Sequence, residues 1–72
     1  MKKKNSFPIN YKIVYESRDI TRERYITTFT AQEAVEQLKL ILSSEQYTIT
    51  NVYEWDQYVG GGSWIEDTEY II

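Results

Sequence analysis

The segment TAQEAVEQLKLIL, residues 30–42, decides the fold class because it carries both a helix start signal and a helical period. Thr30 and Glu33 form a capping-box pattern: the threonine hydroxyl can accept the N–H of Glu33, and the glutamate can reach back to the N–H of Thr30. Apolar residues then recur at the spacing of one helix face, namely Ala31, Ala34, Val35, Leu38, Ile41 and Leu42. We therefore predict a helix that begins at Ala31, with Leu38 and Ile41 buried.

Two strands are expected before this helix. Residues 11–16 (YKIVYE) are rich in β-branched and aromatic side chains, residues 17–19 (SRD) are typical of a turn, and residues 20–29 follow as a second strand. Residues 1–10 contain three lysines and little apolar surface, so they are expected to form a flexible basic arm. Alternation divides the second strand into two faces, one with Arg22, Arg24, Ile26 and Thr28 and the other with Tyr25, Thr27 and Phe29.

Two further strands are expected after the helix, over residues 47–59 and 63–72, joined by a turn at the three glycines 60–62. Ile49 and Val52 cannot both face the core in a strict period of two, so a bulge near Thr50 and Asn51 is predicted. The element order is ββαββ. Residues 11–72 should therefore form a single α+β domain, with one helix packed on a mostly antiparallel sheet.

Composition excludes several functions. The 72 residues contain neither cysteine nor histidine, which removes the common catalytic triads, disulfides and the usual zinc ligands. The glycines lie between strands and lack the lysine of a phosphate-binding loop. The N-terminal segment lacks the apolar run of a signal peptide, and no stretch is long enough to span a membrane. We expect a soluble, cytoplasmic protein that is not an enzyme and uses no cofactor or metal.

Charge is unevenly divided along the chain. Residues 1–39 hold eight basic and five acidic side chains, a net charge of +3, while residues 40–72 hold six acidic side chains and no basic one, a net charge of −6. Such asymmetry bears on the choice of partner more than on the fold. It indicates that the second half of the domain meets a basic surface.

The second hairpin, residues 52–70, combines two tryptophans, three tyrosines and five carboxylates without a lysine or arginine. Aromatic side chains are enriched at binding hot spots, and carboxylates around them would attract a basic protein. The predicted partner-binding residues are Glu54, Asp56, Tyr58, Trp64, Glu66, Asp67 and Glu69. Strand alternation predicts Tyr53 or Trp55 under the helix. It places Tyr58 outward with Glu54 and Asp56, or next to the tip, as the exposed anchor. Alternatively, the aromatics are core and the acids form a solvated face.

Two other functions remain open. Lys12, Arg22 and Arg24 could form a basic stripe on the outer face of the first hairpin and bind nucleic acid, although Glu16 and Glu23 interrupt it. An exposed edge strand could also pair with its copy, which would make the chain an oligomerisation domain.

In size, cysteine-free composition and charge layout, the chain is similar to small phage-encoded proteins that disable host defence nucleases, anti-CRISPR proteins among them. This resemblance concerns general character and assigns no role to any residue. It implies an inhibitor that occupies the basic surface of a nucleic-acid-handling protein, with carboxylates where phosphates would stand. We expect this function first, with nucleic-acid binding and self-association as alternatives.

Overall fold

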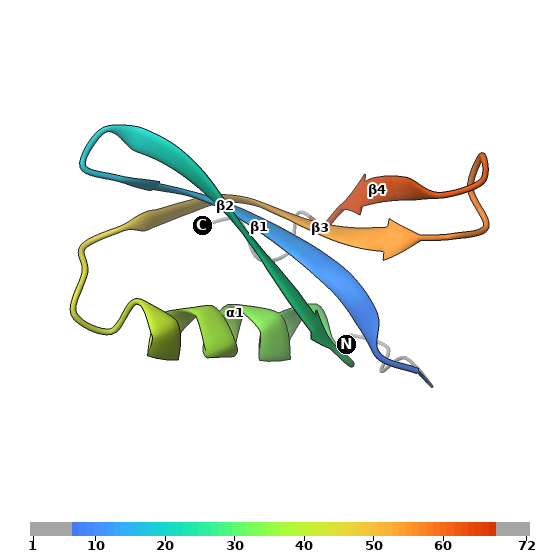
Figure 1. Ribbon diagram of the computed structural model, residues 1–72, viewed down its shortest axis with the longest axis horizontal. Helices are drawn as coiled ribbons and strands as arrows, with labels where there is room; N and C mark the ends of the chain where they lie inside the picture. Colours follow the sequence, from blue (N-terminus) through green and yellow to red (C-terminus); the bar gives the residue numbers. More distant parts are fainter. Residues whose placement is uncertain (1–6, 68–72) are drawn as a thin grey trace.

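The computed structural model describes residues 7–67, which form a sheet covered on one face by a helix (Figure 1). The elements within these residues are β1 (Ile9–Ser17), β2 (Ile20–Thr28), α1 (Ala31–Ile41), β3 (Thr48–Asp56) and β4 (Ser63–Glu66). The predicted ββαββ order and the α+β class are confirmed. β1 begins two residues earlier than expected, so the predicted arm over residues 1–10 loses Ile9 and Asn10 to the sheet. Residues 7 and 8 precede β1 without regular structure, and residues 1–6 of the arm lie outside the described part.

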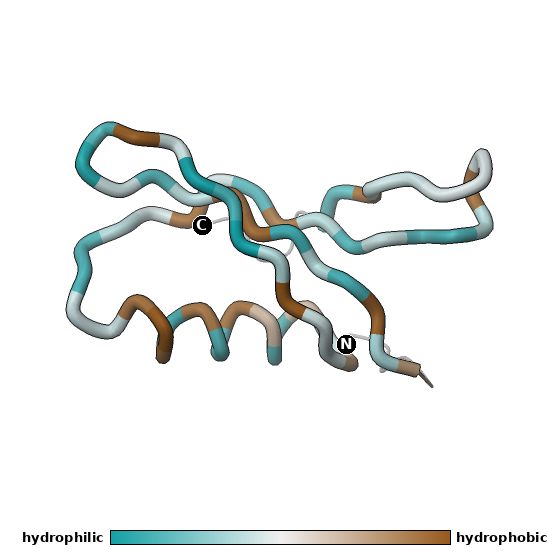
Figure 2. Tube along the Cα trace, in the orientation of Figure 1, coloured by the Kyte–Doolittle hydropathy of each residue, from teal (hydrophilic) through white to brown (hydrophobic). Residues whose placement is uncertain are grey.

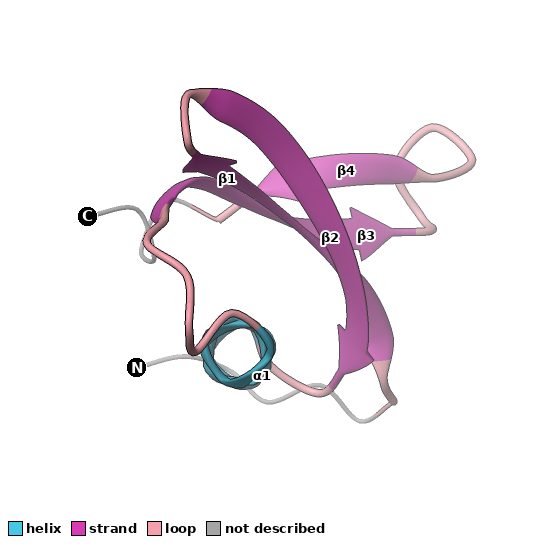
Figure 3. Cartoon of the chain, turned by 60° about the vertical axis from the view of Figure 1, so that its left-hand side comes forward, coloured by secondary structure: helices cyan, strands magenta, loops and turns pink. Residues whose placement is uncertain are grey.

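The strand order in the sheet is β2-β1-β3-β4, and every neighbouring pair is antiparallel. β2 and β3 both run against β1, so they run in the same direction, and α1 connects them on one face of the sheet (Figure 3). β1 is therefore the central scaffold, while β2 and β4 form the two edges. Among the described residues, no helix is long and apolar enough to cross a membrane.

The start of α1 is fixed by Thr30, as predicted. Thr30 has an extended backbone, and its Oγ1 accepts the N–H of Glu33 at 3.0 Å. The other half of the predicted capping box is replaced, because the Glu33 carboxylate accepts the hydroxyl of Thr28 at 3.1 Å. The cap thereby ties the end of β2 to the first turn of the helix.

The core lies between α1 and the helix-side face of the sheet. β1 contributes Tyr11, Ile13 and Tyr15, and the other buried apolar residues are Ile26, Ala31, Ala34, Val35, Leu38, Leu42 and Val52. Leu38 is fully buried, as predicted, but Ile41 is 50% exposed and that prediction was wrong. A straight helix cannot keep its whole stripe on a twisted sheet. At the C-terminal end of the helix, the Leu42 side chain is therefore buried against the sheet, while the Ile41 side chain points toward solvent.

A bulge at Thr50 sets the phase of β3, as the sequence predicted. Val14 pairs with Asn51, but the next residue of β1, Tyr15, pairs with Ile49. The skipped residue, Thr50, donates its hydroxyl to the Val14 carbonyl at 3.2 Å. Ile49 and Val52 consequently both lie on the helix side of the sheet.

Candidate functional site

The β3–β4 hairpin extends past the helix at one end of the molecule, while the β1–β2 turn lies at the other end (Figure 1). The molecule measures 36 × 21 × 19 Å. Along the hairpin the chain is mainly hydrophilic or of intermediate hydropathy, with few apolar positions (Figure 2). The two ends therefore offer separate surfaces for binding.

The hairpin tip, residues 57–62, is a defined turn. All three of its glycines have positive φ, with values of 57°, 80° and 125°. The Gly62 N–H donates to the Val59 carbonyl at 2.8 Å, and the Tyr58 N–H donates to the Asp56 carboxylate at 2.9 Å. These bonds fix the tip, where the Tyr58 side chain is 86% exposed. The expected exposure of Tyr58 is confirmed, and of its two expected places, the strand face and the tip, the residue occupies the tip.

An outer-face cluster lies on the side of the sheet away from the helix; it comprises Lys12, Tyr25, Tyr53, Trp55 and Trp64. Trp55 and Trp64 are cross-strand partners whose rings meet edge to face, with centroids 5.2 Å apart. The Trp64 ring also lies 5.9 Å from the ring of Tyr25. The prediction that Tyr53 or Trp55 packs under the helix was wrong, because the bulge turns both residues to the outer face.

Lys12 brings a positive charge from β1 into this cluster. Its Nζ atom lies 4.8 Å from the centroid of the Tyr53 ring and 5.0 Å from that of the Trp64 ring. Both distances suit a cation–π contact. Beside it, the Tyr25 hydroxyl donates to Glu23 at 2.9 Å, and this hydrogen bond to a carboxylate raises the pKa of Tyr25.

The acids of the hairpin are divided between its two faces. Glu54 and Asp56 pair with Ile65 and Ser63 and share the helix-side face with Val52, but they lie beyond the end of β3 that the helix covers. Glu66 lies on the outer face and accepts a hydrogen bond from the Asn51 amide at 2.7 Å. The structure thus brings Glu54 and Asp56 together near Tyr58, and it separates them from Glu66 and Trp64.

Two predicted partner-binding acids do not join this surface. Asp67 is only 8% exposed, and its N–H donates to the Val52 carbonyl at 2.7 Å. Placing Asp67 on an exposed acidic face was therefore wrong, because its backbone bonds to β3 and its side chain is buried. Glu69 lies outside the described residues.

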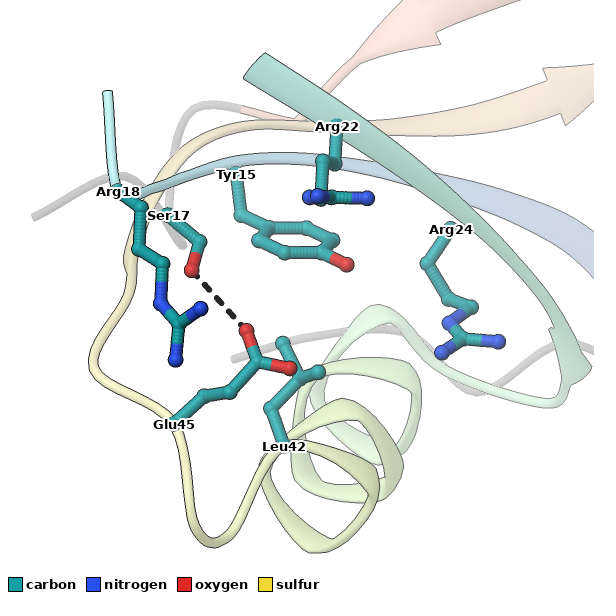
Figure 4. A pocket seen from close by; sticks show the side chains of 7 residues that line it. All are labelled: Tyr15, Ser17, Arg18, Arg22, Arg24, Leu42 and Glu45. Carbon is teal, nitrogen blue, oxygen red and sulfur yellow. Dashed lines mark hydrogen bonds between the residues drawn. The ribbon is translucent and has the colours of Figure 1, made fainter. Parts of the chain in front are cut away.

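The predicted basic stripe is also divided. Arg22 pairs with Tyr15 and Arg24 pairs with Ile13, so both arginines lie on the helix-side face, opposite to Lys12. Placing them on the outer face was wrong. With Arg18 they surround a pocket of about 300 Å³ whose remaining lining residues are Tyr15, Ser17, Leu42 and Glu45 (Figure 4).

The sequence contained the signal for this arginine pocket. Arg22 and Arg24 share a strand face with Ile26, and Ile26 belongs to the core, so the arginines had to be on the helix side. An eleven-residue helix is about 16 Å long, whereas a nine-residue strand spans about 30 Å. The helix therefore covers Ile26 but leaves the turn end of β2 open.

Hydrogen bonds hold the walls of the arginine pocket in place. The Ser17 hydroxyl lies 3.0 Å from a Glu45 carboxylate oxygen and 3.2 Å from the Gln46 carbonyl. This joins the end of β1 to the loop that follows the helix. Within residues 7–67, none of the three guanidinium groups is paired with a carboxylate.

These two surfaces, the acidic side of the β3–β4 hairpin and the arginine pocket, are the candidate binding sites of the molecule. Within residues 7–67, no group of three or more potential metal ligands lies close together. No protein-family model matches the sequence, and neither a curated protein nor a solved structure matches it.

Proposed function

We propose that this chain is a non-enzymatic protein-binding module that uses its β3–β4 hairpin to occupy the basic surface of a nucleic-acid-handling protein. One observation carries the proposal. Glu54 and Asp56 stand on the helix-side face of a hairpin that extends past the helix, next to a tip whose Tyr58 side chain is 86% exposed. Carboxylates beside an exposed aromatic ring are suited to a basic partner.

Apolar side chains complete this surface. Ile65 pairs with Glu54 and is 41% exposed, and Val59 at the tip is 45% exposed. Binding hot spots commonly combine an aromatic or aliphatic anchor with a polar rim that excludes water. Tyr58 with Val59 and Ile65 can supply the anchor, while Glu54 and Asp56 supply charge at the rim.

The hydrogen bonds of the tip support the same function. The bonds from Gly62 N–H to the Val59 carbonyl and from Tyr58 N–H to the Asp56 carboxylate order a glycine-rich turn, which lowers the conformational entropy that is lost when a partner binds. The carboxylates would occupy the place of phosphates, so the partner could not hold nucleic acid at the same time. We extend the proposal to inhibition of the anti-defence kind, as in anti-CRISPR proteins, and to a cytoplasmic location, which the absence of cysteine supports.

The experiment starts with capture of a partner on the immobilised chain, through a photo-crosslinking residue placed at position 58. A crosslinker at position 40 is the matched control, because Leu40 is also highly exposed but lies on the helix. The captured protein is then purified and tested for nucleic-acid binding with and without the chain. We expect crosslinking at position 58 alone, and loss of nucleic-acid binding in proportion to the chain added.

A pair of charge-reversal variants tests the role of the acids. Glu54→Lys should slow association, because electrostatic steering is lost while the Asp56 bond that holds the tip is kept. Glu16→Lys changes the net charge by the same amount on another surface and should bind like the parent. Equal loss in both variants would mean that only net charge matters. A partner that binds nucleic acid and the chain together would show that the chain is not this kind of inhibitor.

The nucleic-acid alternative is less well supported, because Lys12 lies on one face of the sheet and Arg22 and Arg24 lie on the other. A strand running along the first hairpin could not meet all three cations at once. Self-association through the edge strand β2 stays an alternative, and sedimentation over a range of concentrations tests it directly.

A further inference from the structure

The arginine pocket lies at the end of the molecule opposite to the proposed protein-binding hairpin, so it calls for a separate explanation. Figure 4 shows Arg22 and Arg24 reaching from β2 toward the space beside the Tyr15 ring, with Arg18 on the far side next to Ser17. The space is about 300 Å³, at the lower end of the range for small-molecule sites. Its location between a hairpin and the end of a helix is fixed by the Ser17 hydrogen bonds.

The charges of the pocket are unbalanced. Three guanidinium groups and one carboxylate, that of Glu45, line it, which leaves a net charge of +2. The carboxylate already accepts the Ser17 hydroxyl, and none of the arginines is paired within the described residues. The three guanidinium groups repel one another, and a bound anion would reduce this repulsion. Arginine is also the residue whose planar group binds phosphate oxygens in pairs.

The two-residue turn at the pocket requires a backbone conformation that arginine rarely adopts. Arg18 and Asp19 are the two central residues of the β1–β2 turn, and both have positive φ, of 54° and 64°. A two-residue turn of this kind prefers Asn and Gly, because other side chains crowd the backbone there. An arginine held in this conformation at the mouth of a pocket is an independent indication that its side chain serves the site.

The remaining lining defines the chemical class of the ligand. Tyr15 and Leu42 supply a small apolar part of a mainly polar lining, because both side chains are nearly buried. A terminal phosphate carries a charge between about −1.5 and −2 at neutral pH, which matches the pocket, whereas an internal phosphodiester carries only one charge. We propose that the arginine pocket binds a free small molecule with a terminal phosphate, of about the size of a mononucleotide. Its phosphate contacts Arg18, Arg22 and Arg24, and its organic part lies against Tyr15 and Leu42.

The test is a titration of the isotope-labelled full chain, followed by the backbone amide resonances in NMR. The probes are adenosine 5′-monophosphate, adenosine as the control without phosphate, and inorganic phosphate, all at one low salt concentration. We expect the monophosphate to shift the resonances of Tyr15, Ser17 and Arg22 with micromolar to millimolar affinity. Adenosine should leave them in place. If neither the monophosphate nor inorganic phosphate shifts them at millimolar concentration, the proposal is wrong.

Matched variants separate the pocket from general attraction. Arg22→Gln and Arg24→Gln should each weaken binding of the monophosphate by about tenfold or more, because a charge-assisted hydrogen bond is lost. Lys39→Gln removes the same charge from an exposed helix position outside the pocket and should change affinity less than about twofold. Equal effects of all three would overturn the proposal. So would equally tight binding of an oligonucleotide that has no terminal phosphate. Circular dichroism confirms that each variant is folded.

Discussion

Gly62 lies so close to the Trp55 indole that a Cβ atom at position 62 would stand 2.8 Å from Cη2 of that ring and closer still to Cζ2. The turn and the outer-face cluster are therefore parts of one packed unit. Because Trp55 in turn meets Trp64, the shape of the hairpin tip depends on a glycine in direct contact with the ring.

This contact gives a first prediction. Gly62→Ala should lower the free energy of unfolding by more than about 1 kcal/mol, since the residue has a φ of 125° and its new methyl group would displace the ring. Gly61→Ala is the control: its φ is also positive, at 80°, but nothing lies within 4 Å of a Cβ there. Urea unfolding compares the two, and equal losses would show that the ring is easily displaced.

A second prediction concerns the helix. Leu38→Ala should cost about 2–5 kcal/mol, because Leu38 is fully buried and its removal leaves a cavity. Leu40→Ala, on the exposed side of the same helix, should change stability by less than about 0.5 kcal/mol. Thermal and chemical unfolding measure both. A small loss at position 38 would mean that the helix is not held by its contact with β1.

The β1–β2 turn gives a third prediction. Arg18→Asn should raise the free energy of unfolding by about 0.5–1 kcal/mol, because asparagine tolerates a positive φ better than arginine does. Arg22→Asn removes the same charge from an extended strand and should bring no such gain. If both variants are stabilised alike, relief of charge repulsion is the cause and the turn is not strained.

Asp67 gives a fourth prediction. The sequence placed this residue on an exposed acidic face, where a charge reversal would be tolerated, and its burial leads to the opposite expectation. Asp67→Lys should lower stability by more than about 1 kcal/mol, because the side chain is only 8% exposed. Glu54→Lys, on the uncovered part of the hairpin, should cost less than about 0.5 kcal/mol. Unfolding curves recorded side by side test this. A well-tolerated lysine at position 67 would show that the side chain there reaches solvent at little cost.

Local signals in the sequence were sufficient to predict the helix, the strands and the bulge in β3. The Thr30 cap requires only neighbouring residues, and the conflict between Ile49 and Val52 in a period of two forces an extra residue between them. Both features depend on short-range geometry. For this reason the start of the helix and the presence of four strands could be predicted from the sequence.

The faces of the strands were harder to predict, because they depend on contacts between distant segments. The bulge at Thr50 reverses the alternation downstream, so Tyr53 and Trp55 turn outward while Glu54 and Asp56 turn to the helix side. Whether Arg22 and Arg24 are covered depends on where the helix ends relative to β2. The lengths of the two elements show that the helix cannot cover all of β2, but which side chains stay uncovered is a property of the packed molecule.

The central place of β1 has a consequence for how the chain folds as it is synthesised. The first strand of the sheet to emerge from a ribosome is also the one with which both β2 and β3 pair. β2 can join it at once through a two-residue turn, since such local closure is fast. The other side of β1 stays open until the helix and β3 have been made, so the slow event of folding is expected to be the arrival of β3 on a preformed hairpin.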